Sequence, residues 1–172
     1  GLVLEGNRKN VLNNQLVVIT RKDSGTKVTG LQNLGDAQSL ALADGSVPAG
    51  KYTRQALTKL GILGASEDVS KITTQEVSTA LGGVEISEEG NVSKVLMAVV
   101  EGANEVGTTY YSDTYGYEDQ VTILETVSYD LTGNIIYPVC RVENKEATKA
   151  QSKAADDFYQ YIVSDTAKKI YD

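Results

Sequence analysis

The stretch Ser39–Gly61, which reads SLALADGSVPAGKYTRQALTKLG, constrains the fold most, because it joins a strand to a helix through one short loop. Leu40–Ala43 is an apolar run of strand length, and the residues after Pro48 carry the apolar spacing of a helix. Proline suits the first turn of a helix, since its missing N–H is one that the helix could not use. The next amides, beginning with Ala49, have no carbonyl partner inside the helix, and such free N–H groups form an anion site. The alternative is an ordinary strand–loop–helix connection whose free amides bind water. Every helix start has such free amides, so they do not by themselves indicate a ligand.

Strand and helix patterns alternate along the rest of the chain, which predicts a mostly parallel α/β sheet. Thr73 and Glu76 match a capping box, and Asn91 matches an N-cap before an apolar stripe. The acidic segment 84–90 is interpreted as a surface excursion, and residues 1–14 contain little that would fold alone. The expected strands cover residues 15–20, 40–43, 105–113, 121–127 and 135–142, and the expected helices cover residues 48–60, 74–81, 92–101, 147–163 and 166–171.

Three features are predicted to meet at one edge of this sheet, where carboxyl ends of parallel strands and helix starts converge. They are the loop Ser46–Gly50, the helix start at Asn91 and Val92, and the strand end at Tyr110–Asp113. A tyrosine at a strand end can donate its phenolic O–H to an anion. Because side chains alternate along a strand, at most one of two adjacent tyrosines there does so. The residues alone favour a small-anion site, with ordinary packing of the tyrosines as the alternative.

Composition and residue types exclude several classes of function. The formal net charge of −7, from 16 basic and 23 acidic residues, argues against a nucleic-acid binder, which needs a basic face. Histidine is absent, which removes Ser-His-Asp catalysis and His-ligated zinc. The single cysteine, Cys140, lies in the apolar run IIYPVCRV and is interpreted as a buried small hydrophobe. With no GxGxxG or Walker loop either, we expect no enzyme, no cofactor and no protein-bound metal ion.

The residues also carry a resemblance to a known family. The string DGSVPAGKYTRQALTKLG closely resembles a motif of extracytoplasmic molybdate-binding proteins, the solute receptors of ABC transporters. The later strings NVSKVLMAVVEGANEVGTTYYSDTYG, IIYPVCRV and AADDFYQYIVSDTAKKIY are similar to that family in order and spacing. The resemblance implies an α/β fold of the type II periplasmic-binding-protein class, here with one complete lobe and remnants of the other. Residues 20–134 would form the second lobe, and residues 1–19 and 135–172 would be crossing strands and terminal helices of the incomplete first lobe.

Carried onto the matching positions, the resemblance implies a site for molybdate or tungstate made of neutral donors. Ala49 and Val92 would offer backbone N–H groups, and Tyr110 would offer its phenolic O–H. Ser46 and Asn91 are further candidates on the same two loops. Neutral donors suit a doubly charged tetrahedral anion that is held without a counter-charge. Selectivity would then depend on cavity size and on the number of donors.

The resemblance implies a partner and a location as well: an ABC permease in the membrane, and an extracytoplasmic protein that is periplasmic or a cell-surface lipoprotein. Nothing before Gln15 resembles the family's front segment, whose serine-bearing loops complete the anion site. We therefore expect a truncated receptor that binds weakly or not at all. Its apolar face of Phe158, Tyr161 and Ile162 would favour a homodimer through the incomplete first lobe. The alternatives are a ligand-sensing module of a transcription regulator and a receptor for another tetrahedral oxyanion, such as sulfate or phosphate.

Overall fold

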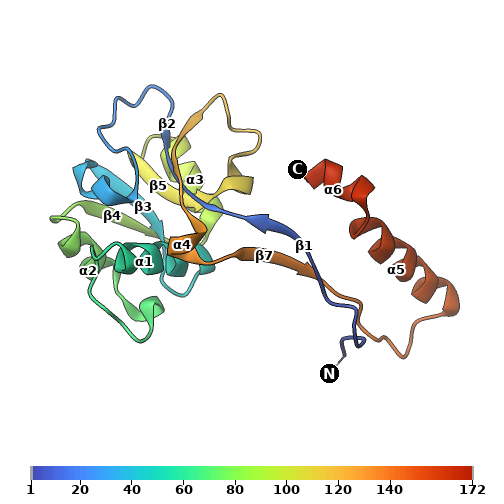
Figure 1. Cartoon of the computed structure of the whole chain (residues 1–172). Helices are drawn as coiled ribbons and strands as arrows, with labels where there is room; N and C mark the ends of the chain where they lie inside the picture. The colour runs from blue at the N-terminus through green and yellow to red at the C-terminus, as the bar shows by residue number, and fades with distance from the viewer. Residues whose placement is uncertain (1, 172) are drawn as a thin grey trace. The chain divides into compact units, whose positions relative to one another are not determined.

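The computed structural model describes residues 2–171 and divides into two compact units. The sheet unit is Gln15–Gly133, and the terminal unit combines Gly1–Asn14 with Asn134–Asp172. Figure 1 draws the chain with its helices and strands labelled. The sheet unit begins at Gln15 rather than at the expected boundary, residue 20, because the strand that follows Gln15 belongs to its sheet.

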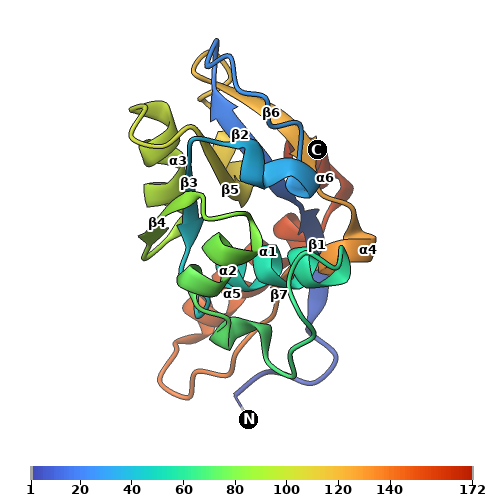
Figure 2. The same ribbon diagram turned by 90° about the vertical axis from the view of Figure 1, so that its left-hand side faces the viewer.

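The sheet unit is built on a five-stranded mixed sheet in the order β4-β3-β5-β2-β6 (Figure 2). β3 runs parallel to both of its neighbours, β4 and β5, whereas β2 is antiparallel to β5 and β6. The expected α/β sheet is therefore present, and β2 is the one strand that runs against the others. The strands are β2 Leu16–Arg21, β3 Ser39–Ala43, β4 Glu85–Glu89, β5 Val106–Tyr110 and β6 Val121–Thr126.

Strand β4 corrects the interpretation of segment 84–90 as a surface excursion. Glu85–Glu89 pairs in parallel with β3, residue for residue from Ser39 to Ala43. The strand lies at the edge of the sheet, so only one side of its backbone is paired. Its glutamates keep this edge charged, and charge on an edge strand limits pairing with other chains.

Helices α1 and α3 cover opposite faces of the sheet. α1 is Pro48–Lys59 and α3 is Val92–Val100. On β5, a Cβ atom at Gly107 would meet two valines of α3, whereas the Thr108 hydroxyl oxygen lies 2.8 Å from that of Thr53 in α1. Neighbouring residues of a strand point to opposite faces, so the two helices lie on either side of the strands, as Figure 2 shows.

Helix α2 (Thr74–Ala80) and helix α3 begin where the capping residues predict. The Thr73 hydroxyl accepts from the Glu76 N–H at 3.2 Å, and the Glu76 carboxylate accepts from the Thr73 N–H at 2.7 Å, which confirms the capping box. The Asn91 side-chain oxygen Oδ1 accepts from the Lys94 N–H at 3.0 Å, which confirms the N-cap of α3. The short elements are η1 Leu31–Asp36, η2 Val69–Lys71, α2 Thr74–Ala80, η3 Tyr111–Thr114 and α4 Tyr129–Thr132.

The core of the sheet unit lies along β2 and β3. Residues 16–19 of β2 and residues 40–43 of β3 are fully buried. A helix covers each face of the sheet here, so every side chain in these two buried runs is apolar rather than every second one. Burial of each Leu, Ile or Val side chain contributes roughly 1.5–3 kcal/mol relative to exposure.

The terminal unit pairs the two ends of the chain. β1 Lys9–Asn14 is antiparallel to β7 Ile135–Val139, so the first residues do form a strand, with a partner from far along the sequence. Two helices follow, α5 Lys149–Ile162 and α6 Asp165–Tyr171. None of the helices within residues 2–171 is long and apolar enough to span a membrane.

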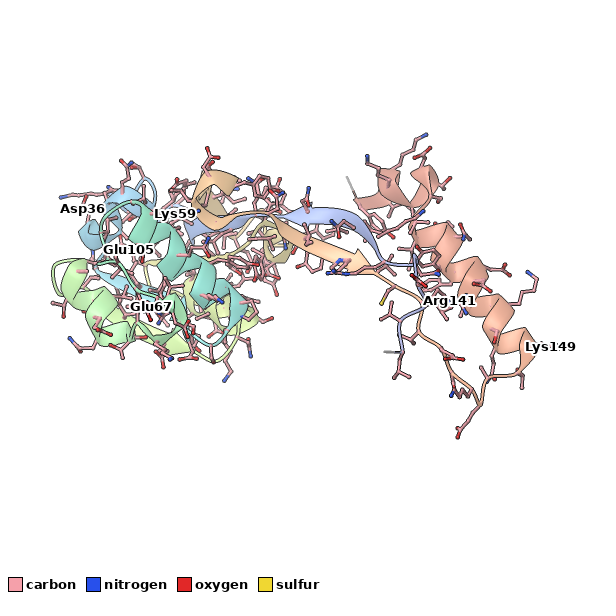
Figure 3. All side chains as sticks on the ribbon, turned by 60° about the horizontal axis from the view of Figure 1, so that its bottom comes forward. Asp36, Lys59, Glu67, Glu105, Arg141 and Lys149 are labelled. Atoms are coloured by element: carbon pink, nitrogen blue, oxygen red, sulfur yellow. The ribbon has the colours of Figure 1, made fainter. Side chains whose placement is uncertain are left out.

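Two side-chain contacts tie α5 to the rest of the terminal unit. The Tyr159 hydroxyl donates to the Asn7 carbonyl at 2.8 Å, and Arg141, labelled in Figure 3, forms an ion pair with Asp156. The expected apolar face is present in part, since Phe158 and Tyr161 are exposed. The interpretation of the cysteine is wrong, because β7 ends one residue before Cys140 and leaves it exposed.

Gly107 supplies a test of the packing of α3 on the sheet. A Cβ atom there would lie 2.9 Å from side-chain carbons of both Val95 and Val99. We expect Gly107→Val to lower the free energy of unfolding of the 172-residue chain by at least about 2 kcal/mol, because overpacking forces side chains out of their rotamers. The matched control is Gly64→Val, where a Cβ atom meets nothing within 4 Å. Equal urea midpoints for the two variants would contradict this packing.

Candidate functional site

Four strands of the sheet unit, β3, β4, β5 and β6, run in one direction and end at the same edge. Ala43 at the end of β3 is opposite Glu89 at the end of β4, and the Asp44 N–H donates to the Glu89 carbonyl at 2.9 Å just beyond. The start of α1 follows β3, the start of α3 follows β4, and Tyr110 is the last residue of β5. The structure thus brings the three predicted features to one edge of the sheet.

The start of α1 is packed directly against the end of β3. Its N-cap is Val47, whose side chain makes no capping hydrogen bond, so the amides of Ala49 and Gly50 have no acceptor within the helix. Both residues are buried. A Cβ atom on Gly50 would lie 2.1 Å from the Asp44 carbonyl oxygen and 2.3 Å from that of Ala43. Only glycine fits this approach, which explains why the loop needs one at that position.

The loop between β3 and α1 is held by its own side chains. The Ser46 N–H donates to Asp44 Oδ1 at 2.8 Å, and the Ser46 hydroxyl donates to the same oxygen. These hydrogen bonds, the hydroxyl first, hold the pKa of Asp44 below its ordinary value. The hydroxyl of Ser46 therefore donates its hydrogen bond within the loop and helps to hold the loop that leads to Ala49.

The start of α3 presents a second pair of amides. Asn91 uses its side-chain oxygen on the third residue of the helix, Lys94, so the amides of Val92 and Ser93 have no acceptor within the helix. Val92 is half-buried and Asn91 is exposed. Asn91 thus caps the helix and orients the neighbouring amide of Val92.

Tyr110 is held at the end of β5 by its backbone. It is opposite Leu16 on β2, and its N–H donates to Asp113 Oδ2 at 3.2 Å. The same carboxylate oxygen accepts from the Thr109 hydroxyl at 2.7 Å. Tyr110 is half-buried, whereas the next residue, Tyr111, is exposed and begins η3.

Sequence motifs do not identify one charged residue behind this edge, Arg54. Arg54 of α1 is only 1% exposed. It lies four residues after Gly50 and three before Leu57, so all three occupy the buried face of α1. A cation on the apolar stripe of an amphipathic helix is the signal that would have identified it.

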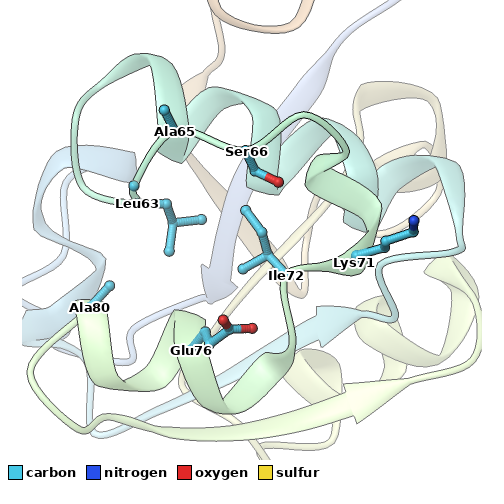
Figure 4. Close-up of a pocket in the computed structure, with 8 residues that line it drawn as sticks. Leu63, Ala65, Ser66, Lys71, Ile72, Glu76 and Ala80 are labelled. Atoms are coloured by element: carbon cyan, nitrogen blue, oxygen red, sulfur yellow. The ribbon is translucent and has the colours of Figure 1, made fainter.

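The sheet unit has a pocket of about 430 Å³ on another part of its surface. Figure 4 shows Leu63 and Ile72 lining it, with Glu76 beside them. It shares no residue with the edge that carries Ala49, Val92 and Tyr110. The Glu76 carboxylate is occupied by the capping box, whose hydrogen bonds from Thr73 lower its pKa.

Comparison with known proteins places the chain in a family. The model of a family described as bacterial extracellular solute-binding protein matches residues 1–172. YvgL of Bacillus subtilis strain 168, assigned as an ABC transporter substrate-binding lipoprotein, is 28% identical over 163 residues. That match covers 94% of this chain and 55% of YvgL, so the chain spans about half the length of this curated relative.

Solved structures agree with the fold. The substrate-binding domain assigned to a molybdenum ABC transporter from Clostridium difficile has a TM-score of 0.73 and 27% identity, and the match covers 99% of this chain and 66% of that structure. The periplasmic molybdate-binding protein of Azotobacter vinelandii has a TM-score of 0.64 and 20% identity, with 97% and 66% covered, which shows the fold alone. Structures of the same fold hold other ligands, including iron and L-phospholactate, so the fold by itself does not select a ligand.

The Asp44–Ser46 contact predicts how the loop responds to acid. The pKa of Asp44 is lower in the folded state than its ordinary value of 3.8. The ionised carboxylate therefore stabilises the loop fully at pH values above 3.8, and this stabilisation is lost as the pH falls through the lower pKa of the folded state. An NMR titration should therefore place the Asp44 midpoint below 3.8, with the Ser46 amide shift following it. Ser46→Ala should move the midpoint upward. A wild-type midpoint at or above 3.8 would contradict the loop geometry.

Proposed function

We propose that this chain, which belongs to the family of bacterial extracellular solute-binding proteins, binds a tetrahedral oxyanion, molybdate or tungstate, for an ABC transporter. The observation that carries the proposal is the meeting of two helix starts and one tyrosine at a single edge of the sheet. Ala49 and Val92 would donate backbone N–H groups to the anion, and Tyr110 would donate its phenolic O–H. Ser46 and Asn91 would hold the two loops rather than bind the ligand.

The chemistry of these donors suits a doubly charged anion. Free amides at helix starts carry the positive end of the helix dipole, so they attract an anion without a cationic side chain on its surface. Hydrogen bonds to a charged acceptor are roughly twice as strong as those between neutral groups. The likeness to the protein assigned to a molybdenum transporter supports molybdate over other anions of the same shape.

The family membership supports a wider role for the whole protein. Its partner would be an ABC permease in the membrane, its location would be extracytoplasmic, and it would act as a binding protein rather than an enzyme. In this proposal the sheet unit is one lobe of the receptor, and the terminal unit belongs to the other. The exposed Phe158 and Tyr161 would be covered by further protein, with a homodimer as one arrangement.

The amide of Val92 offers a sharp test, because proline can remove it at little structural cost. Val92 is the first residue of α3, where proline is favoured, and Asn91 before it is extended with φ −165° and ψ 166°. Calorimetry on the protein at its full natural length should show molybdate and tungstate binding more tightly than sulfate or phosphate. Val92→Pro should weaken molybdate binding about tenfold or more, because one hydrogen bond to a charged group is lost.

The matched control is Val92→Ala, which shortens the side chain and keeps the N–H group. It should retain molybdate affinity within about threefold, since the side chain is not a donor in this proposal. Thermal unfolding of both variants would show whether the fold is intact. Two results would overturn the proposal: no heat with any tetrahedral oxyanion, or equal molybdate affinities for Val92→Pro and Val92→Ala.

A further inference from the structure

Arg54 is the most deeply buried charge in the sheet unit, with 1% of its surface exposed. Burying an unpaired charge costs several kcal/mol, so its surroundings must compensate. Its Nε–H donates to the Ile72 carbonyl at 2.7 Å, and one Nη donates to the carbonyls of Ala43 at 2.9 Å and Gly50 at 3.1 Å. The other Nη donates to the Thr74 hydroxyl oxygen at 3.1 Å. These partners are all neutral.

No carboxylate within residues 2–171 lies at ion-pair distance from Arg54. Burial lowers the pKa of Arg54, and the more distant carboxylates of Glu88 and Asp44 oppose that shift. An arginine keeps its proton in proteins, so the guanidinium remains positive. The positive charge is thus satisfied by hydrogen bonds without being neutralised by direct contact.

The position of this charge is informative. The guanidinium binds the carbonyl of Ala43, the last residue of β3, and the carbonyl of Gly50, in the first turn of α1. It therefore holds together the two backbone segments that pack closely at Gly50. The free amides of Ala49 and Gly50 belong to that same turn, so the charge lies only a few ångströms from them.

We propose that Arg54 is a positioning residue for the oxyanion site, which fixes the first turn of α1 against the end of β3 and gives the site its preference for dianions. This inference rests on the proposed function. Arg54 makes no contact with the ligand in this account. It acts through the orientation of the amides of Ala49 and Gly50, and through a positive potential that a doubly charged ligand feels more strongly than a singly charged one.

The test compares two tetrahedral anions of different charge, molybdate and perrhenate, in the protein at its full natural length. The measured quantity is the molybdate-to-perrhenate ratio, which is the affinity for molybdate divided by the affinity for perrhenate. Arg54→Met should lower this ratio about tenfold, because one buried positive charge close to the site is lost. Arg54→Lys should restore most of the ratio, since it keeps the charge, although it cannot make all four hydrogen bonds.

A matched control separates this effect from a loss of stability. Asn104 is also buried, and its side chain donates to the Leu40 carbonyl at 3.0 Å near the start of β3, away from the site. Asn104→Ala should lower the melting temperature and leave the molybdate-to-perrhenate ratio unchanged. Glu88→Gln is a milder variant at an exposed position, and it should raise the ratio about twofold because it removes a charge that opposes Arg54.

The outcomes distinguish this inference from the proposed function. If the wild-type protein binds neither anion, the proposed function fails and the inference falls with it. If the wild type binds molybdate but Arg54→Met keeps the same ratio, only the inference is wrong. If Arg54→Met does not fold, an unchanged ratio in Glu88→Gln would support a purely structural arginine and overturn the inference.

Discussion

The parallel pairing of β3 with both β4 and β5 is the constraint on which the rest of the sheet unit depends. Because these strands share a direction, the segments that leave them emerge at one edge. Two of those segments begin helices with free amides, and the third ends in Tyr110. An antiparallel β3 would send its loop to the opposite edge and separate the donors. The proposed site therefore depends first on strand direction and only then on any single residue.

The anion site proposed in this acidic chain uses neutral donors. The net charge is −7, yet the groups proposed to bind the anion are neutral amides and a phenol. Asp44 accepts from Ser46 within its own loop, and Asp113 accepts from Thr109 and from the Tyr110 N–H. These two carboxylates thus organise the loops through hydrogen bonds. Arg54, the one cation buried among residues 2–171, is held by carbonyls of the same backbone segments.

The sequence predicts the local features of the site well, because they depend on short-range chemistry. Pro48 and Asn91 mark helix starts through backbone geometry and capping, and both helices begin there.

Long-range features are harder to predict. The acidic residues of β4 carry no apolar alternation, so only the pairing with β3 reveals the strand. Likewise, β1 depends on β7, which lies more than a hundred residues away in the sequence. Arg54 belongs to no recognisable motif, because three of its four hydrogen bonds go to backbone carbonyls and the fourth goes to the Thr74 hydroxyl.

We propose above all that one anion binds at the edge where α1 and α3 begin and β5 ends. The most direct test is a crystal structure of the protein at full natural length with tungstate, in which the anomalous signal of tungsten locates the metal without ambiguity. The account predicts one strong peak within hydrogen-bonding reach, through the tungstate oxygens, of the Ala49 and Val92 amides and the Tyr110 hydroxyl. A strong peak elsewhere, for example beside Lys71 in the separate pocket, would contradict it, as would an empty edge at saturating tungstate.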